Sequence, residues 1–200
     1  MALKYFYKSD VFTFYSLSGK DSLDLINRLS TNNISDVHNK VTKTIFTNEN
    51  GRIIDVVSIW KINDKKLLLI CNTKNKNLLI EWIEKFTFDE EIHLKESNKY
   101  ELIHTFTDSR SINIENFDLA GSNIKQYNDK FESFFISKSS FFNQHETIDL
   151  LFDKELSEEV NNILLSQDFK ELNNDQILSY KIKNIIHDGQ NENNLSFNPM

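Results

Sequence analysis

One acidic residue stands inside an apolar run where a carboxylate is unexpected. The stretch NENGRIIDVVSIW, residues 48–60, joins an Asn-Gly turn signal to a strand-like run that contains Asp55. Because side chains alternate between the faces of a strand, Asp55 should share one face with Ile53, Val57 and Ile59, with Ile54, Val56 and Trp60 opposite. Both faces are therefore apolar, as expected for an internal strand. A carboxylate there must accept hydrogen bonds or stay protonated.

Two kinds of partner would satisfy Asp55. The structural alternative is a backbone amide or a basic side chain of the same domain, which would make this residue a structural hydrogen-bond hub. The functional alternative is a ligand with fixed N–H donors. A pterin ring suits this role because its edge offers a ring N–H beside an exocyclic amino group, and a carboxylate can accept from both.

The sequence shows no metal-binding, phosphate-loop or nucleophile motif. The five histidines, His38, His93, His104, His145 and His187, are isolated from one another and from the single cysteine, so no metal site is expected. Cys71 lies within the apolar run of residues 67–71 and is interpreted as a core residue. The segment LSGKDS lacks the spacing of a phosphate loop, and no G-x-S-x-G nucleophile motif occurs.

The charge and composition of the chain limit the kinds of molecule that it is expected to bind. The chain of 200 residues carries a net charge of −7, which argues against general nucleic-acid binding. Charge is uneven: residues 1–85 have a balance of +4 and residues 86–200 one of −11, so the first part could attract an anionic small molecule. Neither a signal-peptide pattern nor an apolar run of membrane-spanning length is visible, so we expect a cytoplasmic protein without a membrane partner.

The periodicity of the sequence predicts an α+β fold. We expect a hairpin over residues 5–18, a helix over 19–30 capped by Ser18, and a three-stranded meander over 40–72. A helix over 74–86, with Leu78 among its apolar positions, and a strand over 99–107 follow. This order is that of a split βαβ (ferredoxin-like) module, with helices on one face of an antiparallel sheet.

The pattern of apolar residues after residue 107 predicts a smaller second module. Short strands are expected at residues 111–116, 131–137 and 147–153, and helices at 154–167 and 173–186, the last capped by Asn174 or Asp175. The expected domains are therefore residues 1–107 and 108–200. They could also form one continuous domain.

Two segments, residues 11–37 and 45–83, resemble the first folate-binding module of the glycine-cleavage T-protein (aminomethyltransferase) superfamily. That superfamily includes the YgfZ-type proteins linked to iron–sulfur cluster maturation. The positions that match its pattern are Ser18, Gly19, Asp21, Thr31, Asn32, Asn48, Gly51, Arg52 and Asn72. The resemblance implies tetrahydrofolate as the cofactor, bound through Asp55, Asn72, Asp149 and Lys181.

Departures from the family pattern favour a role without catalysis. T-proteins have two adjacent acids after the hairpin glycine, whereas Val56 follows Asp55 here, and Lys183 replaces an acid near the end of the chain. The chain stops at Met200, before the Lys-Gly-Cys-Tyr-x-Gly-Gln-Glu motif and C-terminal barrel of YgfZ relatives. We therefore expect a folate-binding-like accessory protein, connected with iron–sulfur cluster maturation or one-carbon metabolism.

Two alternatives remain open. One is an aminomethyltransferase in which Asp55 is catalytic, orienting the folate amine as it takes up the one-carbon unit. The other is a folate-free interaction scaffold whose pocket is filled by some of the 16 phenylalanines. In either case a second copy or another protein is expected to cover the surface left by the missing third domain.

Overall fold

The computed structural model describes residues 3–34, 41–63, 65–72, 74–107, 125–126, 134–139 and 147–183. The chain divides into two compact units with an α+β fold. Unit 1 comprises Met1–Asp10 and Lys99–His187, and unit 2 comprises Val11–Asn98 and Asp188–Met200. This division differs from the expected boundary at residue 107, because strand β1 (Lys4–Lys8) pairs with strand β7 (Tyr100–Thr107). Unit 1 is thus built from segments far apart in the sequence.

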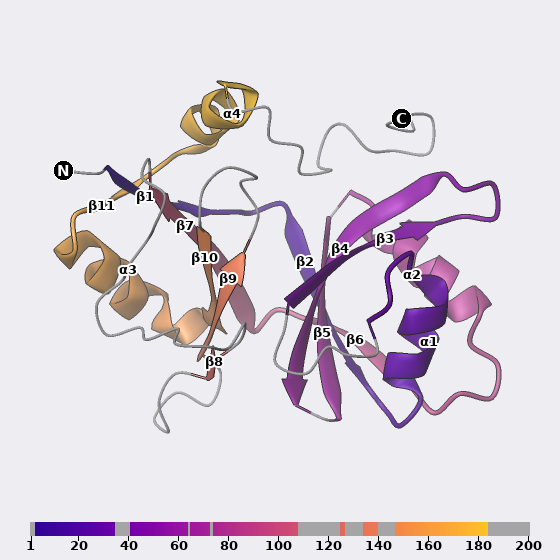
Figure 1. Cartoon of the computed structure of the whole chain (residues 1–200). Coiled ribbons are helices and arrows are strands. Elements are labelled where there is room, and N and C mark those ends of the chain that lie inside the picture. The colour runs from indigo at the N-terminus through magenta and orange to yellow at the C-terminus, as the bar shows by residue number, and fades with distance from the viewer. Residues whose placement is uncertain are drawn as a thin grey trace. The chain divides into compact units, whose positions relative to one another are not determined.

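Unit 2 is a five-stranded antiparallel sheet with two helices, shown in indigo to magenta in Figure 1. Its strands are β2 (Phe12–Ser18), β3 (Val41–Thr47), β4 (Ile53–Asn63), β5 (Lys66–Asn72) and β6 (His93–Ser97), in the order β3-β4-β5-β2-β6. The predicted meander is confirmed as β3, β4 and β5. Strand β4 lies between two neighbours, so Asp55 is on an internal strand as expected.

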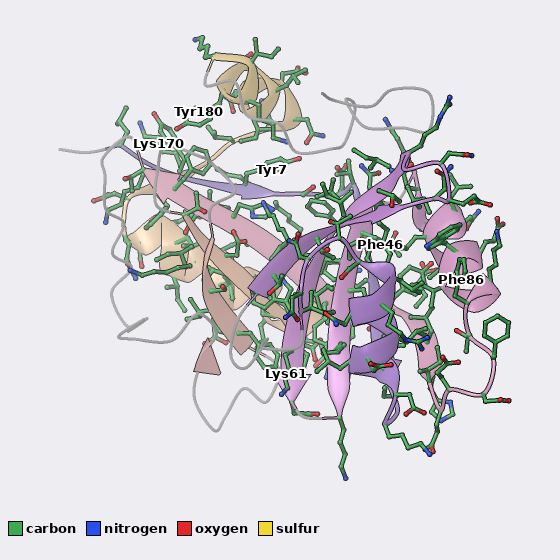
Figure 2. All side chains as sticks on the ribbon, turned by 45° about the vertical axis from the view of Figure 1, so that its right-hand side comes forward. Tyr7, Phe46, Lys61, Phe86, Lys170 and Tyr180 are labelled. Atoms are coloured by element: carbon green, nitrogen blue, oxygen red, sulfur yellow. The ribbon has the colours of Figure 1, made fainter. Side chains whose placement is uncertain are left out.

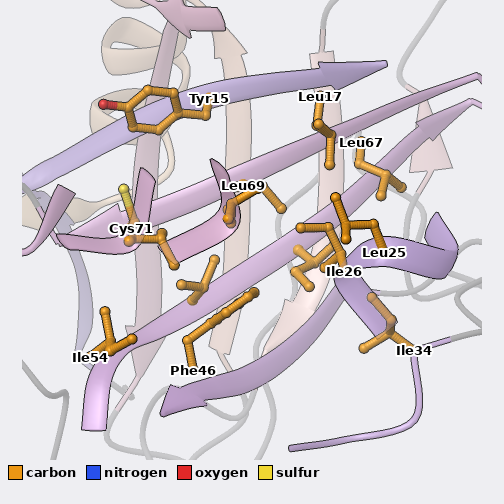
Figure 3. Packing of buried hydrophobic residues seen from close by; sticks show 14 residues of the cluster. Tyr15, Leu17, Leu25, Ile26, Ile34, Phe46, Ile54, Leu67, Leu69 and Cys71 are labelled. Atoms are coloured by element: carbon orange, nitrogen blue, oxygen red, sulfur yellow. The ribbon is translucent and has the colours of Figure 1, made fainter. Parts of the chain in front are cut away.

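Helices α1 (Ser22–Leu29) and α2 (Lys76–Lys85) cover the same face of this sheet. Leu25 and Ile26 of α1 and Leu79 and Ile83 of α2 pack against alternate strand residues in one buried cluster (Figure 3). Leu78, expected on the buried face of α2, is 40% exposed, because the helix turns its Leu79 and Ile83 side inward.

Cys71 is a core residue, as predicted. It lies fully buried within the same cluster (Figure 3), with its thiol 3.5 Å from the Thr13 carbonyl oxygen. Burial raises the pKa of the thiol to about 12. The thiol is therefore protonated and chemically quiet at neutral pH.

The hairpin expected over residues 5–18 is wrong. Strand β2 pairs with β5 and β6, whereas β1 pairs with β7 and β11 (Phe169–Glu171) in the sheet of unit 1. Each of these strands has both edges occupied by other partners, which leaves no edge for a β1–β2 ladder. The turn signal between them marks a change of sheet.

Helix α1 does not begin at a Ser18 cap. Asp21 occupies the cap position and its carboxylate accepts the N–H of Glu91 at 2.8 Å. Gly19 has φ of +122°, and a Cβ atom there would lie 2.0 Å from the Glu91 carbonyl oxygen. Only glycine fits this close approach of two backbone segments.

Unit 1 contains a six-stranded sheet in the order β11-β1-β7-β10-β9-β8. The remaining strands are β8 (Lys125–Gln126), β9 (Phe134–Ser139) and β10 (Thr147–Asp153), and the β1–β11 pair is parallel. After the short 3₁₀ helix η1 (Lys154–Leu156), helix α3 (Ser157–Ser166) packs Val160 and Leu164 against the face that holds Phe6.

Helix α4 (Asn174–Lys183) packs against the other face of this sheet. Its Ile177 joins Tyr7 and Phe106, which alternate with the residues under α3. The helix is capped by Asn173, one or two residues before the predicted caps Asn174 and Asp175. The Asn173 side-chain oxygen accepts the N–H of Gln176 at 2.9 Å, and the Gln176 side-chain oxygen accepts the N–H of Asn173 at 3.0 Å. The strand expected at 111–116 lies outside the described residues.

Candidate functional site

Asp55 sits beside a bulge in strand β4. Phe46 of β3 pairs with Asp55, but Thr47 pairs with Ile53, so Ile54 is an extra residue in the ladder. This shift brings Ile54, rather than Ile53, into the core cluster with Val57, which corrects the alternation predicted from sequence. Asp55 itself is only 2% exposed.

The Asp55 carboxylate bonds with its own chain. Its Oδ2 atom accepts the N–H of Asn72 at 2.9 Å, and its Oδ1 atom accepts the N–H of Val56 at 2.9 Å and the Asn75 side-chain amide at 3.4 Å. The β4–β5 ladder ends at the pair Ser58–Ile70, so beyond it a carboxylate oxygen replaces a strand carbonyl as the acceptor for Asn72. These are the main-chain amide partners of the structural alternative.

Asn72 extends this network into the turn before α2. Its carbonyl oxygen accepts the N–H of Asn75 at 3.0 Å, and its side-chain oxygen accepts the N–H of Lys74 at 2.9 Å. Asp55 and Asn72 therefore meet, and together they fix the β5–α2 turn. No cation among the described residues forms an ion pair with Asp55, and burial raises its pKa to about 6 in spite of the three amide bonds.

A second cluster lies on the sheet of unit 1. Tyr7, His104, Asp149 and Ser137 are register partners on the adjacent strands β1, β7, β10 and β9, and we call them the polar row. All four are buried. His104 Nδ1 lies 2.7 Å from Asp149 Oδ1, and the Tyr7 ring stacks on the imidazole with centroids 6.5 Å apart. The Asp149 Oδ2 atom makes no hydrogen bond with any residue that the structure describes.

Lys181 reaches the same cluster from helix α4. Its ammonium lies 5.5 Å from the centroid of the Tyr7 ring, a cation–π geometry, and the residue is 7% exposed. Asp149 and Lys181, far apart in the sequence, are thus connected through Tyr7 and His104. Figure 2 labels Tyr7 among the side chains of unit 1.

Sequence reasoning missed Tyr7 and His104. The available signal was a histidine at an alternate position in an apolar strand, but its carboxylate partner depends on the register between β7 and β10. Among the described residues, no group of three or more His, Cys, Asp or Glu side chains could hold a metal ion. Nor does that part of the chain contain a helix long and apolar enough to cross a bilayer.

Comparison with known proteins identifies the fold. Residues 8–105 match the GCVT N-terminal domain. The chain thus matches this domain family over just under half of its length. It is 35% identical over 79 residues to an aminomethyltransferase of Clostridium botulinum (strain Okra / Type B1), covering 38% of this chain and 21% of that protein. An aminomethyltransferase of Thermosipho melanesiensis is 29% identical over 89 residues, covering 44% of this chain and 24% of that protein. The matched region therefore spans about a fifth of the length of these relatives.

Two solved structures extend the likeness beyond the matched domain. The glycine cleavage system aminomethyltransferase T from Bartonella henselae superposes with a TM-score of 0.67 at 12% identity, covering 86% of this chain and 48% of that one. A chain of heterotetrameric sarcosine oxidase from Corynebacterium sp. U-96, in complex with pyrrole 2-carboxylate, gives a TM-score of 0.54 at 9% identity and covers 82% of both chains. At these identities the superpositions establish a shared fold. The likeness in fold therefore extends beyond residues 8–105 to most of the chain.

Proposed function

We propose that this protein is a cytoplasmic, non-catalytic, folate-binding accessory member of the aminomethyltransferase-like superfamily, acting in iron–sulfur cluster maturation or one-carbon metabolism. The observation that carries the proposal is the commitment of Asp55 to its own chain. Both carboxylate oxygens accept internal amide N–H groups. A carboxylate held in this way is not free to orient a folate amine during aminomethyl transfer.

Within this proposal, Asp149 is the acceptor for the pterin edge. His104 holds its Oδ1 atom, while its Oδ2 atom bonds with no described residue and can accept a ligand N–H. Lys181 supplies positive charge on the same sheet face for the carboxylates of the ligand. Asp55 and Asn72 then contribute indirectly, by fixing the turn that precedes helix α2.

Calorimetric titration of tetrahydrofolate and its polyglutamates into the full chain tests this function. We expect saturable binding that weakens at least tenfold in Asp149→Asn, because the amide turns one acceptor into a donor. The matched control is Asp89→Asn, an exposed acid in the loop after α2, which should bind as the wild type does. Absence of heat at high micromolar protein removes the folate ligand, and equal affinity in Asp149→Asn removes the assigned acceptor.

The enzymatic alternative has a separate test. An aminomethyltransferase would form methylene-tetrahydrofolate from an aminomethyl donor, and Asp55→Asn would abolish this product. We expect no product from the wild-type chain. Turnover that depends on Asp55 would contradict the non-catalytic role.

A folate-free interaction scaffold is the second candidate. The sarcosine oxidase chain that matches this protein over 82% of its own length belongs to a heterotetramer, so a chain of similar extent with this fold is there one part of an assembly. Light scattering combined with a pull-down from the native organism distinguishes the two candidates. A stable complex together with absent folate binding would favour the scaffold.

A further inference from the structure

A pocket lies between helix α4 and strand β1 in unit 1, and no residue of the polar row lines it. Its volume is about 360 Å³, within the range of about 300–1,000 Å³ that is usual for small-molecule sites. The lining residues on which its chemistry depends are Tyr5, Asp175, Gln176, Ser179, Tyr180 and Lys183.

The wall of the pocket is aromatic. The rings of Tyr5 and Tyr180 both pack against the buried Phe106 ring, with centroid-to-centroid distances of 5.6 and 4.8 Å. Both tyrosines are half-buried, so part of each ring is backed by the core while the rest borders the pocket. Figure 2 labels Tyr180 on helix α4. Rings supported in this way suit a planar aromatic ligand, which gains from offset stacking as well as from burial.

The polar side of the pocket follows one face of α4. Asp175, Ser179 and Lys183 recur every four residues, and none of their side chains forms a hydrogen bond or ion pair with another described residue. With a rise of 1.5 Å per residue, the acid and the base stand about 12 Å apart along the helix. The helix dipole alone would favour an acid in the first turn and a base in the last turn. It does not explain why these charged residues border a pocket that is also lined by aromatic rings.

We propose that this α4–β1 pocket binds a small aromatic carboxylate that carries an amino group at its other end. The ring lies against Tyr5 and Tyr180, the carboxylate meets Lys183, and the amino group donates to Asp175. Ser179, midway between the two charges, bonds with a linking amide of the ligand. The proposal goes beyond the folate-binding function and holds whether or not a pterin binds in unit 1.

The probe for this site is N-(4-aminobenzoyl)glutamate, titrated into the full-length chain and followed by NMR chemical shifts. Lys183→Glu should weaken its binding at least tenfold, because the anion then meets a negative charge. The matched control is Lys170→Glu on β11, another exposed lysine of unit 1 that does not line the pocket and is labelled in Figure 2. It should change the affinity less than twofold.

A second variant tests the orientation of the ligand. Asp175→Asn should weaken the amino-bearing probe severalfold while leaving benzoylglutamate, which lacks the amino group, unaffected. The pocket assignment is overturned if the wild type shows no saturable shifts, or if Lys183→Glu and Lys170→Glu have equal effects. It is also overturned if shifts occur away from Tyr5 and Tyr180.

Tetrahydrofolate in a parallel titration separates this inference from the proposed function. Fragment binding that depends on Lys183 supports the pocket even when tetrahydrofolate gives no heat, a result that would remove only the folate function. Tetrahydrofolate binding without any fragment binding would overturn the pocket and leave the folate function in place.

Discussion

Replacing Asp55 with asparagine should remove a pH dependence of stability that this buried acid creates. Burial raises its pKa from 3.8 in the unfolded chain to about 6 in the folded protein. The folded state therefore binds the proton more tightly, so the stabilisation is complete below pH 3.8 and is lost as pH rises through about 6. A shift of about two pKa units corresponds to about 3 kcal/mol at neutral pH, of which about 1.5 kcal/mol develops between pH 5.0 and 7.5.

The assay is urea unfolding at pH 5.0 and 7.5, followed by tryptophan fluorescence. Both tryptophans, Trp60 on β4 and Trp82 on α2, belong to unit 2, so the signal reports on the unit that contains Asp55. Wild type should gain about 1.5 kcal/mol relative to Asp55→Asn on going from pH 7.5 to 5.0. The exposed Asp89→Asn variant should follow wild type.

Two results would refute this reasoning. The first is an Asp55→Asn variant that keeps the pH dependence of wild type, which would mean that Asp55 does not titrate between these pH values. The second is the opposite sign, in which acidification destabilises wild type relative to the variant. That sign would mean that the three amide bonds outweigh desolvation and hold the pKa below 3.8.

Three further predictions concern single sites. Gly19→Ala should lower the free energy of unfolding by more than about 2 kcal/mol. Gly51→Ala should lower it by only about 1 kcal/mol, because no atom lies within 4 Å of the added Cβ. Thermal melting of both variants measures the difference. His104→Leu should destabilise by about 3–5 kcal/mol because it leaves the Asp149 carboxylate buried and unpaired, and His104→Leu combined with Asp149→Leu should cost less than the single change. Cys71 should resist a maleimide reagent at pH 7.5 until denaturant is added, since its thiol is buried with a raised pKa; rapid labelling of the native chain would contradict this.

The sequence predicted those parts of the fold that depend on local signals. The meander β3–β4–β5 follows from alternating apolar residues and the Asn50-Gly51 turn, and α1 and α2 follow from helical spacing. The β1–β2 hairpin failed because a turn signal does not say which strands will pair across it. Strand β1 instead pairs with β7, nearly a hundred residues away, and nothing within residues 5–18 encodes that partner.

The same distinction separates the two halves of the candidate site. Asp55 and Asn72 lie on adjacent strands of one meander, so their proximity could be expected from the order of the turns. The contact between Asp149 and His104 depends on the register of β10 against β7, which the sequence between these strands does not specify. A shift of one residue would have sent the carboxylate to the opposite face of the sheet.

The contrast between Asp55 and Asp149 shows why burial alone does not mark a ligand site. Both acids are almost fully buried, at 2% and 5% exposure. Asp55 directs both oxygens to amides within its own unit, two of them in the main chain, and these bonds form whenever β4 and the β5–α2 turn fold together. Asp149 directs one oxygen to a side chain and bonds with no described residue through the other. The hydrogen bonds of Asp55 therefore stabilise the fold and occupy both of its oxygens. Asp149 uses one oxygen for His104, so its other oxygen can still accept a hydrogen bond from a ligand.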